Sequence, residues 1–284
     1  MAICKQKISS TENCDREEYK DGLCIIHHDS DDKPEGLFRR IIRDDIYRGY
    51  YNFSYMISYD GFSFEGLKIL KDANLLFRNS SFYGPFHIRN YDLKASLDFT
   101  DSDFDSGIFI VMSNVHKEII IKNSKINMDF NMSLSNLYSL DIDNITVDCN
   151  CSISNSDIMD KLKFNHIYFK NNFSLLNSSL IGDASFENIV IEGDADFRNI
   201  KFYKSLKFEN VQIKGNTIPV EITENKNIEF KNVVINGKLI EDNQKEKKEK
   251  EKKKKELEQI KEAKDKMYKE TLLNNKYSNR KNNN

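Results

Sequence analysis

The chain has 284 residues with a formal net charge of −2, 39% hydrophobic residues, no Trp, 3 Pro and 11 Gly. Hydrophobic residues are numerous enough for a core, but they nowhere form the run of about 18 that a transmembrane helix needs. The opening segment MAICKQKISS carries charges where a signal peptide has an apolar stretch of about 7 to 15 residues. We therefore expect a cytoplasmic protein without a transmembrane segment.

Three of the 5 cysteines lie within the first 24 residues, beside two histidines. The pattern there is Cys, nine residues, Cys, nine residues, and then Cys-Ile-Ile-His. Its four candidate ligands are Cys4, Cys14, Cys24 and His27. A Cys₃His set binds Zn²⁺ tetrahedrally and leaves no open position, which is typical of structural zinc. Residues 1–33 are thus predicted to form a zinc module, with His28 as the alternative to His27. The competing hypothesis is an N-terminus without metal.

Residues 34–50 are predicted to contain an amphipathic helix, at 35–48, that covers the first coil of the repeat region. Asp31 or Asp32 is its expected N-cap, and Pro34 lies near its first turn. The apolar residues at helical spacing are Leu37, Phe38, Ile41, Ile42 and Ile46.

From Leu75 to Lys238 the sequence repeats every 11 residues, with one residue missing after Ser139. The first, third and eighth positions are apolar, the sixth is small or β-branched, and the others are polar. Neither the helical period of 3.6 nor a long alternating strand gives this spacing. Very short strands with inward residues two apart, separated by sharp turns, do give it, and they stack into a parallel solenoid.

The fifth position of the repeat is Asn in ten of fifteen units. A turn favours Asn because this residue tolerates unusual backbone angles and hydrogen-bonds nearby backbone. A structural role therefore explains the pattern, and a ligand-binding row of Asn is the alternative. The ten residues are Asn79, Asn90, Asn123, Asn144, Asn155, Asn177, Asn188, Asn199, Asn210 and Asn232.

The ends of the repeat region are less regular. Before Leu75 the register is offset by two, and Phe53 and Phe64 are expected to point inward. Residues 217–227 place Pro219 in an inward position, which predicts an irregular coil there.

This alternation of five- and six-residue units resembles the pentapeptide-repeat family. The resemblance implies a right-handed quadrilateral parallel β-helix over residues 51–240, with four units in each 22-residue coil. The segment CDREEYKDGLCIIHHD is similar to a cysteine/histidine module at the front of some members. The first gap is shorter in those members, so Cys4 departs from their pattern.

Residues 241–273 are rich in Lys and Glu and are predicted to form an exposed, coiled-coil-like helix, followed by a disordered tail at 274–284. Residues 241–284 carry a net charge of +5, whereas residues 75–240 carry −4.

No nucleophile, base and orienting group occur together, and no glycine-rich phosphate loop is present, so we do not expect an enzyme. We expect a scaffold that binds other proteins, without a small-molecule substrate or nucleic acid. The resemblance also implies two alternatives: a DNA-mimicking protein that binds a type II topoisomerase such as gyrase, and an end-to-end homodimer. The basic tail suggests a third, which is peripheral membrane association.

Overall fold

The computed structural model describes residues 2–69, 72–218, 228–240 and Glu258. The chain divides into two units, Met1–Ile240 and Glu241–Asn284, and the first is described below. The predicted helix at 241–273, apart from Glu258, and the predicted tail at 274–284 lie outside the described residues. So does Pro219, with most of the predicted irregular coil.

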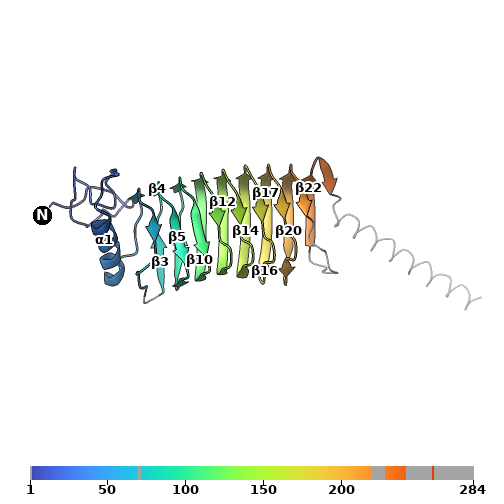
Figure 1. The fold of residues 1–284 in the computed structure, drawn as a ribbon, viewed down its shortest axis with the longest axis horizontal. Helices are drawn as coiled ribbons and strands as arrows, with labels where there is room; N and C mark the ends of the chain where they lie inside the picture. Colours follow the sequence, from blue (N-terminus) through green and yellow to red (C-terminus); the bar gives the residue numbers. More distant parts are fainter. Residues whose placement is uncertain (1, 70–71, 219–227, 241–257, 259–284) are drawn as a thin grey trace, which may run out of the picture. The chain divides into compact units, whose positions relative to one another are not determined.

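The first unit is mostly β-structure with one short helix, and its strands form a parallel β-solenoid of about eight turns (Figure 1). Most strands pair with the strand one turn later, and most paired residues are 22 apart, as in Phe86 with Ile108 and Leu140 with Leu162. Two eleven-residue repeats therefore make one turn, as the resemblance implied.

Two sheets run along the solenoid. The fifteen-stranded sheet contains β1 (Ile57–Ser58), β3 (Ala73–Leu76), β4 (Ser81–Phe82), β6 (Asp92–Leu93), β7 (Ala95–Asp98), β8 (Asp103–Phe104), β10 (Asn114–Ile126), β12 (Asn136–Val147), β14 (Asp157–Phe169), β16 (Ser179–Leu180), β17 (Asp183–Ile191), β19 (Lys201–Phe202), β20 (Leu206–Ile213), β22 (Ile228–Ile235) and β23 (Lys238–Ile240). The eight-stranded sheet contains β2 (Phe62–Ser63), β5 (Phe86–Arg89), β9 (Ile108–Val111), β11 (Phe130–Asn131), β13 (Cys151–Ser152), β15 (Phe173–Ser174), β18 (Ala195–Asp196) and β21 (Thr217–Ile218). Only β22 and β23 pair antiparallel among these strands.

The interior is a continuous apolar column. Phe77 stacks on Phe99 of the next turn at 5.3 Å between ring centroids, and Phe82 stacks on Phe104 at 4.9 Å. The predicted inward residues Phe53 and Phe64 are also buried. The largest fully buried side chains in the solenoid are Phe53, Phe64, Phe77, Phe82, Phe86, Phe99, Phe104, Phe130, Phe164, Phe169 and Phe173.

The fifth repeat position forms the turns, as predicted. All ten Asn residues there have a left-handed backbone, with φ between 49° and 56°. Where the sixth position is Ser, its hydroxyl joins successive turns: the backbone N–H of Ser102 donates to Ser124 Oγ at 3.1 Å, and Ser102 Oγ donates to Phe77 O at 2.6 Å. A small polar residue is therefore satisfied inside the solenoid.

Two irregularities of the repeat are visible in the strand register. Ile57 pairs with Ser81, 24 residues later, which confirms the predicted offset of two. Between Leu137 and Ser139 the chain has one residue, Tyr138, where each neighbouring turn has two. The missing residue therefore lies just before Ser139, whereas the sequence placed it just after Ser139.

The helix α1 (Glu35–Arg48) has the predicted bounds. Its N-cap is Pro34, which makes no side-chain capping hydrogen bond, so the predicted Asp cap was wrong. The last turn closes on Gly49, whose φ of 85° suits a residue without Cβ. The apolar stripe Phe38, Ile42 and Ile46 is buried. None of the described helical residues forms a segment long and apolar enough to cross a membrane.

Candidate metal centre

The N-terminal segment folds back on itself and brings two cysteines together. The backbone N–H of Cys4 donates to Arg16 O, and the backbone N–H of Cys14 donates to Gln6 O, both at 2.9 Å. These antiparallel contacts bring Cys4 and Cys14 close to each other, although nine residues separate them in the chain.

The other two residues come from one tight turn. The backbone N–H groups of His27 and His28 both donate to Cys24 O, at 3.1 and 2.9 Å. This turn places Cys24 Sγ 3.4 Å from His27 Nδ1.

The four side chains converge in one buried cluster, with their ligand atoms all within 4.8 Å of one another. A tetrahedral zinc site with ordinary bond lengths separates two sulfurs by about 3.8 Å and a sulfur from a nitrogen by about 3.6 Å. The distance between Cys14 Sγ and Cys24 Sγ is 3.9 Å, and Cys4 Sγ lies 3.4 Å from His27 Nδ1. The cluster therefore has the donor set and the spacing of a tetrahedral site that could hold a metal.

His27 is oriented by the solenoid. Its Nε2 lies 3.0 Å from the backbone oxygen of Ser54, which can only accept a hydrogen bond. Nε2 therefore carries the proton, and the lone pair of Nδ1 faces the sulfurs. A hydrogen bond from the second ring nitrogen is the usual way in which a protein orients a metal-binding histidine.

His28 points elsewhere. Its Nε2 lies 3.4 Å from Asp21 Oδ2, and its ring packs edge-on against Tyr19. The two histidines that the sequence left as alternatives are thus separated by the structure, because only His27 joins the cluster.

Without metal, the thiols of Cys14 and Cys24 differ in acidity. The Cys24 thiol hydrogen-bonds to the Cys14 sulfur, and this contact lowers the pKa of Cys14 to about 3. The same contact, together with burial, raises the pKa of Cys24. A thiolate is thus already favoured at Cys14.

Arg16 connects the cluster to the rest of the unit, and sequence reasoning missed it. Its guanidinium donates to Cys14 Sγ at 3.6 Å, to Asp45 Oδ2 at 2.7 Å and to Asn52 O at 3.0 Å. It also lies over the Phe53 ring, 5.5 Å from the centroid. One cation therefore links the cysteines, α1 and the first turn. No local pattern indicates this role, because Asp45 and Asn52 lie 29 and 36 residues from Arg16 in the sequence.

A second set of contacts joins the segment to the solenoid. The backbone N–H of Ile57 donates to Ile26 O at 3.0 Å, and Lys33 Nζ donates to Ile57 O at 2.6 Å. Lys33 also lies over the Phe38 ring at 5.4 Å. Its burial lowers the pKa of the ammonium to about 8.

The remaining cysteines and histidines lie apart. Burial raises the pKa of Cys151 well above its usual value, which makes it an inert core residue, and Cys149 is half-buried at a turn. His116 and His166 contact single aspartates. Among the described residues, the four N-terminal side chains form the one group suited to a metal.

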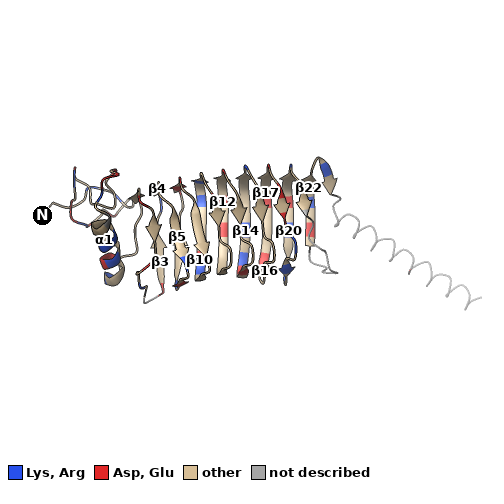
Figure 2. Cartoon of the chain, in the orientation of Figure 1, with Lys and Arg blue, Asp and Glu red and all other residues tan. Residues whose placement is uncertain are grey.

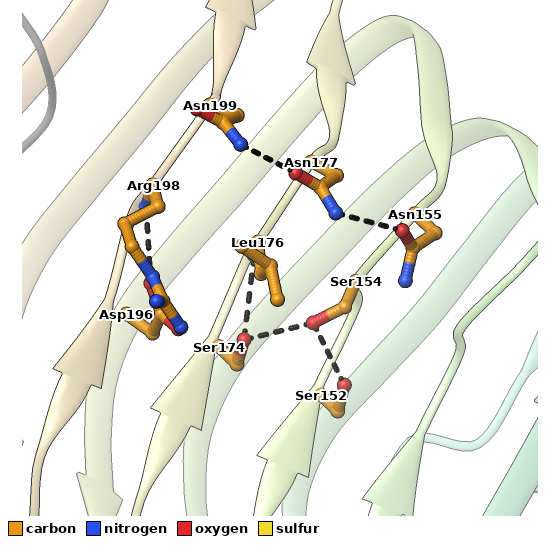
Figure 3. A network of polar contacts seen from close by, with 9 residues as sticks. All are labelled: Ser152, Ser154, Asn155, Ser174, Leu176, Asn177, Asp196, Arg198 and Asn199. Atoms are coloured by element: carbon orange, nitrogen blue, oxygen red, sulfur yellow. Dashed lines mark hydrogen bonds and ion pairs between the residues drawn. The ribbon is translucent and has the colours of Figure 1, made fainter.

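The outer surface of the solenoid is built from rows of polar contacts between successive turns. Basic and acidic side chains are interspersed (Figure 2), and many pair across one turn, such as Lys170 with Asp148 at 2.7 Å and Lys214 with Glu192 at 2.7 Å. Along one edge Asn199 Nδ2 donates to Asn177 Oδ1 at 2.8 Å, and Asn177 Nδ2 donates to Asn155 Oδ1 at 3.1 Å (Figure 3). These contacts satisfy the side chains structurally.

The described residues line several cavities, and two of them have volumes of a few hundred Å³. One of about 470 Å³ lies at the last turns and is lined mainly by apolar residues, including Phe208, Phe230 and Ile240. The other, of about 300 Å³, lies between α1 and the loop after β2. Neither lining brings together a nucleophile and a base.

Comparison with known proteins leaves the resemblance to the pentapeptide-repeat family as an expectation from the sequence. No family model, no curated protein and no solved structure matches the chain.

Proposed function

We propose that this protein is a non-enzymatic scaffold in which a zinc ion fastens an N-terminal cap to a β-solenoid that binds other proteins. The observation that carries the proposal is the buried Cys₃His cluster, whose histidine is oriented by the first turn of the solenoid through Ser54. A cap of this kind shields the first strands, whose unpaired edge would otherwise invite aggregation.

The proposed ligands of zinc are Cys4, Cys14, Cys24 and His27. When bound, zinc supplies the positive charge that cross-links three thiolates and an imidazole. The arrangement favours a structural role, because all four positions come from the protein and all four side chains are buried. Arg16 offsets the negative charge that three thiolates bring to a divalent ion.

For the solenoid we propose a right-handed quadrilateral coil of the pentapeptide-repeat type. The 22-residue register and the inward third and eighth positions support this. A right-handed connection is also the rule for parallel strands joined within one sheet.

A protein-binding role is supported by how the solenoid is filled. Aromatic and aliphatic side chains fill most of its described interior, and the cavity of about 470 Å³ at the last turns has a mainly apolar lining without a nucleophile and a base. The long sides remain as the surface for recognition. A topoisomerase-binding DNA mimic would need a continuous acidic surface, and the acidic residues of the described turns are instead interspersed with basic partners.

The test is affinity capture with the tagged full chain, compared with a Cys24→Ser variant and a matched His28→Ala control. We expect the wild type and His28→Ala to retain one partner protein in stoichiometric amount. Recovery of no stoichiometric partner would count against a scaffold. Inhibition of purified gyrase by the wild type would favour the DNA mimic instead, and tail-dependent co-sedimentation with anionic liposomes would favour membrane association.

A further inference from the structure

Two turns of the solenoid break the Asn pattern in the same way. Met112 and Leu134 occupy the turn position with φ of 52° and 57°. A left-handed backbone costs a residue with a bulky side chain about 1 to 2 kcal/mol, and Asn is favoured there because its side chain can hydrogen-bond locally. The other described turns of this edge are Asn90, Asn155, Asn177 and Asn199.

The two exceptions form one exposed apolar site. Met112 is 50% exposed and Leu134 is 54% exposed. They lie one turn apart, since the backbone N–H of Met112 donates to Ser133 O at 3.3 Å. Phe109 and Val111 are half-buried just before Met112. We call these four residues the apolar step. Strain combined with exposure is hard to explain by folding alone, and it points to function.

The neighbouring surface carries no charge. The outward positions that continue from the apolar step along the eight-stranded sheet are Asn131, Ser133, Ser152, Ser154, Ser174 and Leu176, and we call them the serine face. Its hydroxyls bond to one another. Ser133 and Ser152 lie 2.9 Å apart. Ser152 bonds to Ser154 at 3.0 Å, and Ser154 to Ser174 at 2.8 Å (Figure 3). Hydroxyls that are already paired lose little when a partner displaces water from them.

Ionisable side chains appear only at the two ends of this surface. His87 and Arg89 precede the apolar step, and Asp196 and Arg198 follow the serine face. Arg198 and Asp196 pair with each other through contacts of 2.6 to 3.2 Å (Figure 3).

We propose that the apolar step and the serine face together form the contact between two copies of this chain, packed side by side in opposite directions. Identical uncharged faces can meet without repulsion, and in a two-fold dimer the same patch serves both copies. Packing in the same direction would bring the two Arg89 side chains together. The opposite direction sets Arg89 of each copy beside the paired Asp196 and Arg198 of the other, which carry no net charge together.

The size of the surface sets the strength of this dimer. With the end strands β5 and β18 included, whose Arg89 and Asp196 face each other across the two copies, six neighbouring strands at about 4.8 Å each give a length of about 29 Å, and four to five residues across give about 15 Å. Two such faces bury about 850 Å² in total, below the roughly 1,200 Å² of stable complexes. The dimer is therefore weak and depends on concentration.

The test is sedimentation velocity of the full chain over roughly 1 to 300 micromolar, the range in which a weak dimer dissociates. We expect the wild type to pass from monomer to dimer. The double variant Met112→Asn/Leu134→Asn should weaken dimerisation at least about tenfold. Because Asn fits these turns, the double variant should also unfold at an equal or higher temperature, which separates lost contact from lost fold. Val111→Ser is a second variant, and it introduces the residue that the next two turns carry at this position. It should also weaken dimerisation.

Leu239→Asn is the matched control, because Leu239 is 65% exposed on β23, away from the proposed face. It should leave dimerisation unchanged. A wild type that stays monomeric over the whole range would overturn the proposal. So would a dimer that survives Met112→Asn/Leu134→Asn, or one that Leu239→Asn alone removes, which would indicate end-to-end contact instead.

Discussion

The N-terminal segment and the solenoid are stabilised in opposite ways. In the solenoid successive turns repeat the same kinds of contact: stacked apolar side chains inside, left-handed turns, mostly at Asn, at the edges, and hydrogen bonds to the turns on either side. The segment before α1 has no such repetition. Its buried residues are three cysteines, two isoleucines, two histidines and a lysine. Loss of one contact should therefore be local in the solenoid and global in the N-terminal segment.

Removal of metal gives the largest expected difference between the two regions. Structural zinc contributes about 10 kcal/mol or more to the folding of a small module. A strong chelator should therefore unfold residues 1–33 while the β-structure of the solenoid persists. Limited proteolysis with mass spectrometry should show new cleavage before Pro34 and protection beyond Phe53. Equal cleavage along the whole chain would contradict this separation.

A core substitution tests the opposite region. Phe99 is fully buried and stacks on Phe77, so Phe99→Ala should cost about 3 to 5 kcal/mol of unfolding free energy in denaturant titration. Phe99→Leu keeps most of the volume and should cost less than half as much. Both variants should retain metal, because the contacts from Phe99 to the cysteine cluster run through Phe77, Phe53 and Arg16. Metal loss in Phe99→Ala would show that the two regions are less independent than the contacts indicate.

Arg16 links the N-terminal segment to α1 and to the first turn of the solenoid. Arg16→Met removes the partner of the buried carboxylate Asp45, whose pKa is already raised by burial. An unpaired buried charge costs about 3 kcal/mol. Stability should therefore fall, and much of it should return in Arg16→Met/Asp45→Leu, which removes both charges. If the double variant is no more stable than Arg16→Met, the ion pair is not the source of the loss.

These contacts show where sequence reasoning reached its limit. The repeat predicted stacked short strands and Asn turns because each is a local property repeated many times, whereas the 22-residue coil was implied by the resemblance to pentapeptide-repeat proteins. Arg16 was missed because its partners Cys14, Asp45 and Asn52 meet only in three dimensions. The choice between His27 and His28 depended on Ser54, which lies in the first turn of the solenoid. Helix α1 was placed from its apolar spacing, but its cap was misassigned because Asp32 is engaged by Ser30 rather than by the helix.

The smallest expected effect is a pH dependence within the solenoid. Asp98 is buried, which raises the pKa of its carboxyl, but hydrogen bonds from Arg78 and Thr100 outweigh burial and lower it overall. The folded pKa then lies below the unfolded one, so the stabilisation is fully present above the unfolded pKa, near pH 4, and is lost as pH falls through the folded pKa. Asp98→Asn should cost about 1 to 2 kcal/mol at pH 7, since Arg78 is half exposed.

The measurement for this substitution is the free energy of unfolding of wild type and Asp98→Asn at pH 7 and near pH 2.5. The difference between the two proteins should shrink at the lower pH. A difference that stays constant would mean that the carboxylate charge contributes nothing.

The central claim is that the four N-terminal side chains bind one zinc ion, and metal content of the purified full chain by mass spectrometry tests it most directly. We predict one zinc per chain in the wild type and in His28→Ala, and none in Cys24→Ser or His27→Ala. A wild type free of metal, or zinc retained in both Cys24→Ser and His27→Ala, would contradict the account.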